Sequence, residues 1–202
     1  MVAVSKQRPV DAIREAFDAG CRDFGENYVQ EALPKLAALA DAPIVWHFIG
    51  HLQSNKARDV AEHFDWVHGI DKVKTAAALA RARPEPLGDL NVCLQVNISA
   101  EHTKGGVAPR DALAVAREIA AFPRLKLRGL MGMASPTDDI SEQRAQFARL
   151  AATRDALNAA GLALDTLSMG MTQDFEAALA EGATMVRIGT AIFGERSRKQ
   201  AA

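Results

Sequence analysis

The sequence contains few cysteines and no hydrophobic run long enough to cross a membrane. Cys21 and Cys93 are far apart, so neither a CxxC metal site nor a disulfide framework is expected. A membrane helix needs about 20 consecutive apolar residues, and no segment approaches that length. The residues before Pro9 are also too few for a secretory signal. These absences predict a protein of the cytoplasm, where cysteines stay reduced.

The chain also lacks an excess of charge of either sign. It has 24 Lys and Arg against 25 Asp and Glu, a formal net charge of −1 over 202 residues. Nucleic acids and membrane surfaces select clustered positive charge. The only basic cluster, Arg196, Arg198 and Lys199, is interpreted as a solvated chain end. We therefore expect no nucleic-acid or membrane partner, and we expect a globular monomer.

Eight short apolar or β-branched runs are spread along the chain. They are Val2–Ser5, Arg22–Gly25, Ile44–Gly50, Trp66–Gly69, Val92–Asn97, Leu127–Met133, Thr166–Gly170 and Met185–Ile188. Most of the intervals show helical spacing of apolar residues, as in Val10–Ala19. Alternating strands and helices predict a parallel sheet, and eight units favour a (β/α)8 TIM-type barrel. We expect one α/β domain over residues 1–202, with an open sheet of five or six strands as the alternative.

In such a barrel the active face is built from loops at the carboxyl ends of the strands. Lys6 directly follows the first predicted strand. Apolar surroundings at the barrel mouth would lower the pKa of its amine, and a neutral amine attacks an aldehyde to form a Schiff base. Alone, a lysine after a short strand is more often an ordinary surface residue.

The second and third predicted strands carry weaker signals. Asn27, in Phe24-Gly25-Glu26-Asn27-Tyr28, could present its amide to a ligand or cap the helix that follows. His47 alternates with apolar neighbours in the third strand, which favours a core histidine over a catalytic one.

The turns after the seventh and eighth strands are rich in small and hydroxyl residues. Ser168 and Thr172 belong to the first turn, and Gly189 and Thr190 belong to the second. Barrels often bind phosphate with these two loops, and glycine lets the backbone approach an anion. Strand eight adjoins strand one in a closed barrel, so one aldehyde phosphate could bridge Gly189-Thr190 and Lys6. Pyridoxal 5′-phosphate (PLP) has that composition, and a phosphosugar barrel is the competing interpretation.

Several segments together resemble one known family. AVSKQRP, DFGENYVQE, WHFIGHLQSNK, LRGLMGM and LSMGMTQDFEAALAEGATMVRIGTAIFGER occur in the order typical of the YggS/PROSC family of PLP homeostasis proteins. The resemblance implies a barrel similar to the amino-terminal domain of alanine racemase. It also implies PLP held as a Schiff base on Lys6, with Asn27 lining the pocket.

The same resemblance suggests roles for the later motifs. Arg187 of MVRIGT would face the pyridine nitrogen, while Gly189 and Thr190 would meet the phosphate. Ser168 and Thr172 of SMGMT would add hydroxyl or backbone donors.

The chain departs from the family pattern in two places. The family usually carries a helix of some thirty residues before the AVSK strand, and this chain starts without it, which predicts an exposed part of the barrel wall. Lys104 matches a family lysine near the pocket, but Gly105 stands where the family usually has serine.

Three functions remain open at this point. The first is a non-catalytic carrier that holds PLP and passes it to apo forms of PLP-dependent enzymes. The second is a PLP-dependent racemase or decarboxylase-like enzyme, and the third is an aldolase-type barrel that uses Lys6 without PLP. Racemases of this fold need a second acid–base residue, typically a tyrosine from an added domain, and Tyr28 is the only tyrosine here. An arginine at the pyridine nitrogen also weakens the electron sink. Both points favour the carrier.

Overall fold

The computed structural model describes residues 1–99 and 105–195. Eight strands alternate with helices along this part of the chain. The strands are β1 (Val2–Val4), β2 (Asp23–Glu26), β3 (Val45–Phe48), β4 (Trp66–Ile70), β5 (Leu90–Gln95), β6 (Leu125–Met131), β7 (Thr166–Ser168) and β8 (Arg187–Ile188). Each overlaps one of the eight strands predicted from the sequence.

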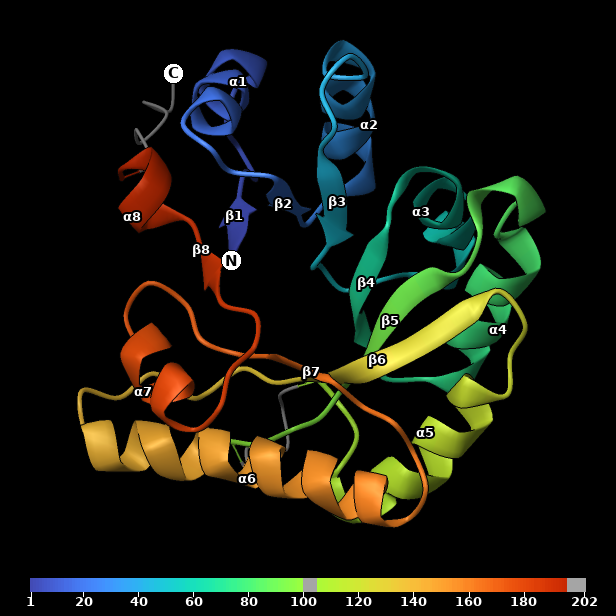
Figure 1. Cartoon of the computed structure of the whole chain (residues 1–202), viewed down its shortest axis with the longest axis vertical. Helices are drawn as coiled ribbons and strands as arrows, with labels where there is room; N and C mark the ends of the chain where they lie inside the picture. Colours follow the sequence, from blue (N-terminus) through green and yellow to red (C-terminus); the bar gives the residue numbers. More distant parts are fainter. Residues whose placement is uncertain (100–104, 196–202) are drawn as a thin grey trace.

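Helices lie on the outside of the ring of strands (Figure 1). The α-helices are α1 (Val10–Asp18), α2 (Val29–Ala38), α3 (Ala57–His63), α4 (Val73–Ala82), α5 (Ala112–Ala120), α6 (Ile140–Ala159), α7 (Phe175–Ala180) and α8 (Thr190–Phe193). Short 3-10 helices are η1 (Ser54–Lys56), η2 (Glu85–Leu87) and η3 (Pro109–Asp111). In α1 the apolar residues share one face, as the 3.6-residue period predicts, and Ile13 on that face is completely buried.

The strands form one parallel sheet in the order β7-β6-β5-β4-β3-β2-β1-β8. The last seam closes through an isolated bridge between Ser168 and Met185. Main-chain hydrogen bonds support it from Met185 N to Leu167 O and from Met169 N to Met185 O, both at 3.1 Å, and from Arg187 N to Gly170 O at 2.9 Å. The predicted eight-stranded barrel is therefore confirmed, and the open sheet is excluded.

The helix-cap interpretation of Asn27 was wrong. The residue before α2 is Tyr28, which has an extended backbone (φ −129°, ψ 122°) and makes no side-chain capping bond. Asn27 lies one residue too early to cap this helix, which leaves its side chain available elsewhere.

The inside of the barrel is partly polar. His47 and His68 are fully buried, and so is Ser168. A hydrogen bond of 2.7 Å joins His68 of β4 to Ser168 of β7. Because β4 and β7 are not neighbours in the sheet, this bond crosses the barrel interior. The ring nitrogens of His47 lie 2.9 Å from His68 Nε2 and 2.9 Å from Asp23 Oδ1, so His47 is a satisfied core histidine, as predicted.

No helix within residues 1–99 and 105–195 is both long and apolar enough to span a bilayer.

Candidate functional site

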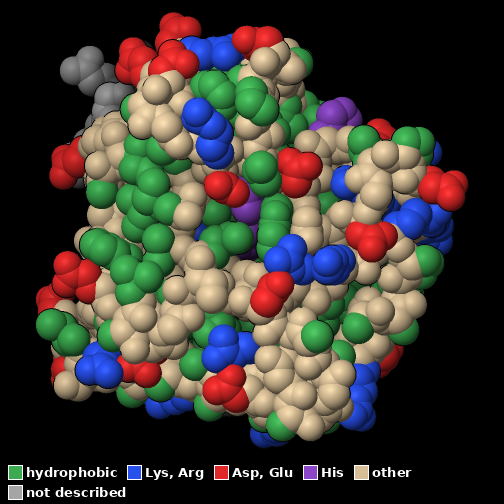
Figure 2. All heavy atoms as spheres, in the orientation of Figure 1, with side chains coloured by type: hydrophobic (Ala, Val, Ile, Leu, Met, Phe, Trp, Pro, Cys, Tyr) green, Lys and Arg blue, Asp and Glu red, His purple; other side chains and the backbone are tan. Residues whose placement is uncertain are grey.

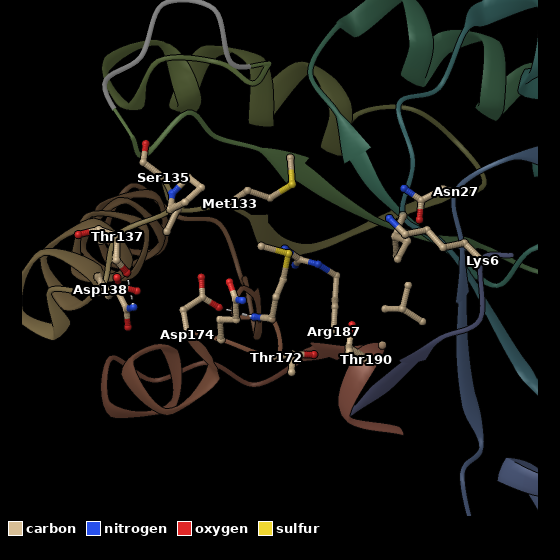
Figure 3. A pocket seen from close by; sticks show the side chains of 18 of the residues that line it. Lys6, Asn27, Met133, Ser135, Thr137, Asp138, Thr172, Asp174, Arg187 and Thr190 are labelled. Atoms are coloured by element: carbon tan, nitrogen blue, oxygen red, sulfur yellow. Dashed lines mark hydrogen bonds between the residues drawn. The ribbon is translucent and has the colours of Figure 1, made fainter. Parts of the chain in front are cut away.

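A cavity of about 750 Å³ opens at the carboxyl ends of the strands (Figure 3). Its walls come from the loops after β1, β2, β3, β6, β7 and β8. The lining residues are Val4, Lys6, Arg8, Asn27, Ile49, Met133, Ala134, Ser135, Pro136, Thr137, Asp138, Gln143, Met171, Thr172, Gln173, Asp174, Arg187, Gly189 and Thr190. Loops at this end of a barrel are where (β/α)8 proteins bind ligands.

Six of the seven residues proposed from the sequence line this one cavity: Lys6, Asn27, Thr172, Arg187, Gly189 and Thr190. Ser168 does not line it. The Ser168 side chain is fully buried, and its hydroxyl is bonded to His68 and Arg187. Lys104, the other lysine singled out, lies outside the described residues.

Lys6 stands on a tight turn that is held on both sides. Ser5, before it, donates from Oγ to Glu26 Oε1 at 2.6 Å and accepts a 2.9 Å bond from Lys35 Nζ on its main-chain oxygen. Gln7, after it, has a left-handed backbone (φ 59°) and donates its N–H to Glu31 Oε1. The main chain is thereby fixed immediately before and after the lysine.

Lys35 links these contacts into one cluster. Its Nζ lies 2.9 Å from Glu26 Oε1 and 2.6 Å from Glu31 Oε1, and its side chain is 8% exposed. Burial raises the pKa of Glu26, while hydrogen bonds from Ser5 and Lys35 oppose that rise. Buried charges of this kind are tolerated only when they are paired and hydrogen-bonded. The cluster is therefore a rigid support for the Lys6 turn.

Arg8 joins the Lys6 turn to the end of α8. Its guanidinium lies over the Phe193 ring, 5.8 Å from the centroid, and donates to the main-chain oxygen of Gly194. These contacts tie the lysine turn to α8, whose first residue is Thr190.

Asn27 is held by close backbone packing against the loop after β3. A Cβ at Gly50 would lie 2.1 Å from the main-chain oxygen of Asn27, so only glycine fits there. The side-chain Oδ1 of Asn27 is buried and has no hydrogen-bond partner within the described part of the chain. Figure 3 shows Asn27 and Lys6 on the same side of the cavity. An unpartnered buried acceptor beside a primary amine suits a ligand that carries a donor.

Arg187 forms part of the cavity wall although it is only 5% exposed. Its Nη1 donates to the main-chain oxygen and the Oγ of Ser168, both at 2.7 Å, and its Nη2 donates to Gly132 O at 3.1 Å. Of the five guanidinium hydrogens, Nε–H and one on Nη2 have no acceptor among the described residues. Burial lowers the pKa of Arg187 to about 10, so it remains cationic at neutral pH.

The loops after β7 and β8 form the remaining wall. Gly170 has a left-handed backbone (φ 92°), which turns the chain so that Met171 and Thr172 reach the cavity. Gly189 precedes α8 with φ −115°, so no positive φ requires glycine at this position. Gly189 leaves space, and the N–H groups of Thr190 and Ala191, the first two residues of α8, have no acceptor within that helix.

Sequence reasoning missed the residues that support the site. Lys35, Glu31 and His68 were not singled out, although they hold the Lys6 turn and Arg187. The available signal was a second histidine, His68, in an otherwise apolar strand like that of His47. No local pattern marks Lys35, because its role depends on packing against β1 and β2.

Comparison with known proteins gives a consistent picture. The alanine racemase, N-terminal domain, family matches residues 1–197. A pyridoxal phosphate homeostasis protein of Pseudomonas aeruginosa is 57% identical over 196 residues, which is 97% of this chain and 84% of that protein. The protein of the same name from Escherichia coli K12 is 48% identical over 199 residues, covering 97% and 85%.

Solved structures show the same relationship. PipY of Synechococcus elongatus with PLP bound superposes with a TM-score of 0.88 at 41% identity, covering 96% of this chain and 92% of PipY. An alanine racemase of Clostridium difficile superposes with a TM-score of 0.81 at 12% identity. All of this chain aligns with 53% of that racemase, which shows a shared fold.

Proposed function

Since this chain belongs to the family of pyridoxal phosphate homeostasis proteins, built on the alanine racemase N-terminal domain, we propose that it holds PLP covalently through Lys6 without catalytic turnover. One observation carries the proposal: Lys6 shares a single cavity with Arg187, Gly189 and Thr190. The lining therefore contains a primary amine, a cation and the turn at Gly189-Thr190 around one space.

The residues present fit PLP group by group. The amine of Lys6 suits its aldehyde, and the unpartnered Oδ1 of Asn27 suits a hydroxyl donor. The unused N–H groups of Arg187 suit an acceptor such as the ring nitrogen. The N–H groups at the start of α8 suit a phosphate, with Thr172 and Thr190 contributing hydroxyls.

PLP supplies an aldehyde that condenses with primary amines and an electron-withdrawing ring. The chain's own residues would bind and orient it. The cluster around Lys35 fixes the Lys6 turn, and Gly189 leaves room beside Thr190. Arg187 would donate a hydrogen bond to the ring and keep its proton, because its pKa of about 10 is far above that of a pyridine. Ser168 would act through Arg187 instead of touching the ligand.

The position of the acidic and phenolic groups supports a carrier over a racemase or decarboxylase-like enzyme. Tyr28 is 57% exposed and is not among the lining residues. Asp138 and Asp174 line the cavity, but Figure 3 shows them toward the end away from Lys6, with Arg187 between in this view. A racemase needs a second acid–base group facing the lysine across the substrate, typically a tyrosine, and the described residues of this wall include no tyrosine.

The decisive experiment is spectroscopic. Purified protein incubated with PLP should develop a visible absorption band, and borohydride reduction should fix PLP on the peptide that contains Lys6. Lys6→Ala should remove both signals. A colourless wild-type protein would favour the aldolase-type alternative, and full trapping on another lysine would overturn the assignment of Lys6.

We further propose a cytoplasmic monomer that passes PLP to apo forms of PLP-dependent enzymes. Both Cys21 and Cys93 are free thiols, which suits a reducing compartment. Sedimentation of the loaded protein tests the monomer. Recovery of an apo-enzyme's activity, faster than with an equal concentration of free PLP, tests the transfer; equal rates would refute it.

A further inference from the structure

A continuous chain of hydrogen bonds runs through the barrel interior to Arg187. Asp23 Oδ1 lies 2.9 Å from His47 Nε2, and His47 Nδ1 lies 2.9 Å from His68 Nε2. His68 Nδ1 lies 2.7 Å from Ser168 Oγ, which in turn accepts from Arg187 Nη1 at 2.7 Å. The chain thus connects four strands that surround one interior: β2, β3, β4 and β7, with β8 at its end.

The two ends of this chain lie in different surroundings. Asp23 is the first residue of β2, and its side chain is 38% exposed at the amino ends of the strands. Arg187 lines the cavity at the carboxyl ends. Between them His47, His68 and Ser168 are fully buried. Figure 2 shows histidine atoms at the floor of a hollow in the middle of one face, beside acidic side chains.

The donors and acceptors fix the direction of every bond. Arg187 can only donate, and the Asp23 carboxylate can only accept. With both histidine rings neutral, each ring brings one N–H hydrogen and Ser168 brings its hydroxyl hydrogen to the remaining three contacts. Ser168 must therefore donate to His68 Nδ1, His68 Nε2–H to His47 Nδ1, and His47 Nε2–H to Asp23. This is the one arrangement with a single hydrogen in each contact.

The electrostatics agree with a neutral His68 ring. Burial lowers the pKa of His68 well below its usual value, with His47 and Arg187 adding to the effect. The hydrogen bond from His47 holds the pKa of Asp23 below its usual range. His47 is further confined by the Trp66 ring, stacked with centroids 5.6 Å apart. The buried Cys93 thiol, whose pKa burial raises to about 12, also stays neutral beside Arg187.

We propose that Asp23, His47, His68 and Ser168 form a positioning chain for Arg187, so that a carboxylate at the far end of the barrel orients the guanidinium that meets the ligand. The chain keeps a Ser168 lone pair available for Nη1, because the serine hydrogen is committed to His68. Arg187 then presents its unused N–H groups to the cavity. The effect on ligand binding rests on the proposed binding of PLP, whereas the chain of hydrogen bonds from Asp23 to Arg187 does not.

The first test uses the ligand-free protein. ¹⁵N NMR of the histidine rings at neutral pH should show His47 and His68 neutral, each with its hydrogen on Nε2. A hydrogen on Nδ1 of His68, or a doubly protonated ring, would overturn the proposal. This measurement does not depend on whether the protein binds PLP. It therefore tests the hydrogen-bond chain separately from the proposed function.

The second test measures coupling to the ligand. Asp23→Leu removes the terminal acceptor, and we expect about tenfold weaker binding of PLP and a shifted visible absorption maximum. Asp23→Asn retains an acceptor oxygen and should stay within about twofold of wild type. Glu118→Leu, which removes an exposed carboxylate on α5, is the matched control for lost charge. An equal effect of Asp23→Leu and Glu118→Leu would overturn the proposal.

A double-mutant cycle distinguishes positioning from general stability. Ser168→Ala should weaken PLP binding about tenfold in wild type but change it little in an Arg187→Met background, because the chain then has nothing to position. Melting temperatures establish that each variant is folded. Additive losses in the double variant would show that Ser168 acts independently of Arg187 and would refute the chain. Pyridoxine 5′-phosphate, which lacks the aldehyde, should show the same non-additivity.

Discussion

Lys35 Nζ donates a 2.9 Å hydrogen bond to the main-chain oxygen of Ser5, the residue immediately before Lys6. A buried lysine thereby supports the turn that carries the ligand-binding lysine. Its two carboxylate partners, Glu26 and Glu31, hold the same turn through Ser5 Oγ and Gln7 N. The support is separate from the cavity wall, because Lys35 and both carboxylates are absent from the lining.

Glu31→Ala tests this support. It removes two hydrogen bonds, to Gln7 N and Lys35 Nζ, each worth about 1 kcal/mol net. Covalent attachment of PLP should become about tenfold less favourable, while pyridoxine 5′-phosphate, which cannot react with Lys6, should bind almost as before. Glu31→Gln keeps an acceptor oxygen and serves as the control. Equal losses for both ligands in parallel titrations would show that Glu31 shapes the whole cavity and not the lysine turn.

Gly189→Val tests the phosphate end of the cavity. The backbone at φ −115° accepts valine, and a Cβ there would lie at an ordinary 3.5 Å from Val4 Cβ. The rest of the side chain would occupy space beside the first N–H groups of α8. Losing one charge-assisted hydrogen bond, worth about 1.5–3 kcal/mol, should weaken PLP binding by about tenfold to a few hundredfold, and losing two should weaken it more.

Pyridoxal, which lacks the phosphate, should lose much less affinity for Gly189→Val. Gly189→Ala should fall between wild type and valine. Comparable losses for PLP and pyridoxal, measured by titration of folded apo-protein, would make Gly189 a packing residue of the barrel and remove the phosphate from this turn.

The absence of turnover is a third prediction. Wild-type protein loaded with PLP should show no racemase or decarboxylase activity toward common amino acids, because the lining offers no tyrosine opposite Lys6. Chiral chromatography and carbon dioxide release provide the measurements. A rate that scales with protein concentration and disappears in Lys6→Ala would establish an enzyme and end the carrier interpretation.

The buried His68 predicts how stability depends on pH. Its folded-state pKa is lowered, so folding favours the neutral ring while the unfolded chain binds a proton below about pH 6.5. The contribution of the neutral His68 ring to the free energy of unfolding is complete above that pH and is lost as the pH falls toward the folded-state pKa. Urea unfolding should lose about 1.4 kcal/mol from this group between pH 7.5 and 5.5. His68→Gln should flatten that part of the curve, whereas the exposed His63→Gln should leave it unchanged; identical slopes for all three proteins would contradict the assignment.

The sequence alone determined the order of elements and most of the cavity. Short apolar runs alternate with segments whose apolar residues have helical spacing. This pattern predicts eight strands, because each short run must be buried in a parallel sheet. Lys6, Thr172 and Gly189 follow predicted strands, and loops after parallel strands share one face of a barrel, so the sequence placed these residues in one space. These inferences depend on chain order, which a sequence contains in full.

The tertiary structure alone decided which side chains support the site. Ser168 faces the interior and not the cavity, because the seam between β7 and β8 directs it toward His68 and Arg187. Asn27 is a wall residue and not a helix cap, because α2 begins one residue later than a cap at 27 requires. Lys35 meets Ser5 thirty residues away, and Asp23 reaches Arg187 through three other strands. Such contacts depend on how the closed barrel brings distant residues together, and no local spacing in the sequence encodes that geometry.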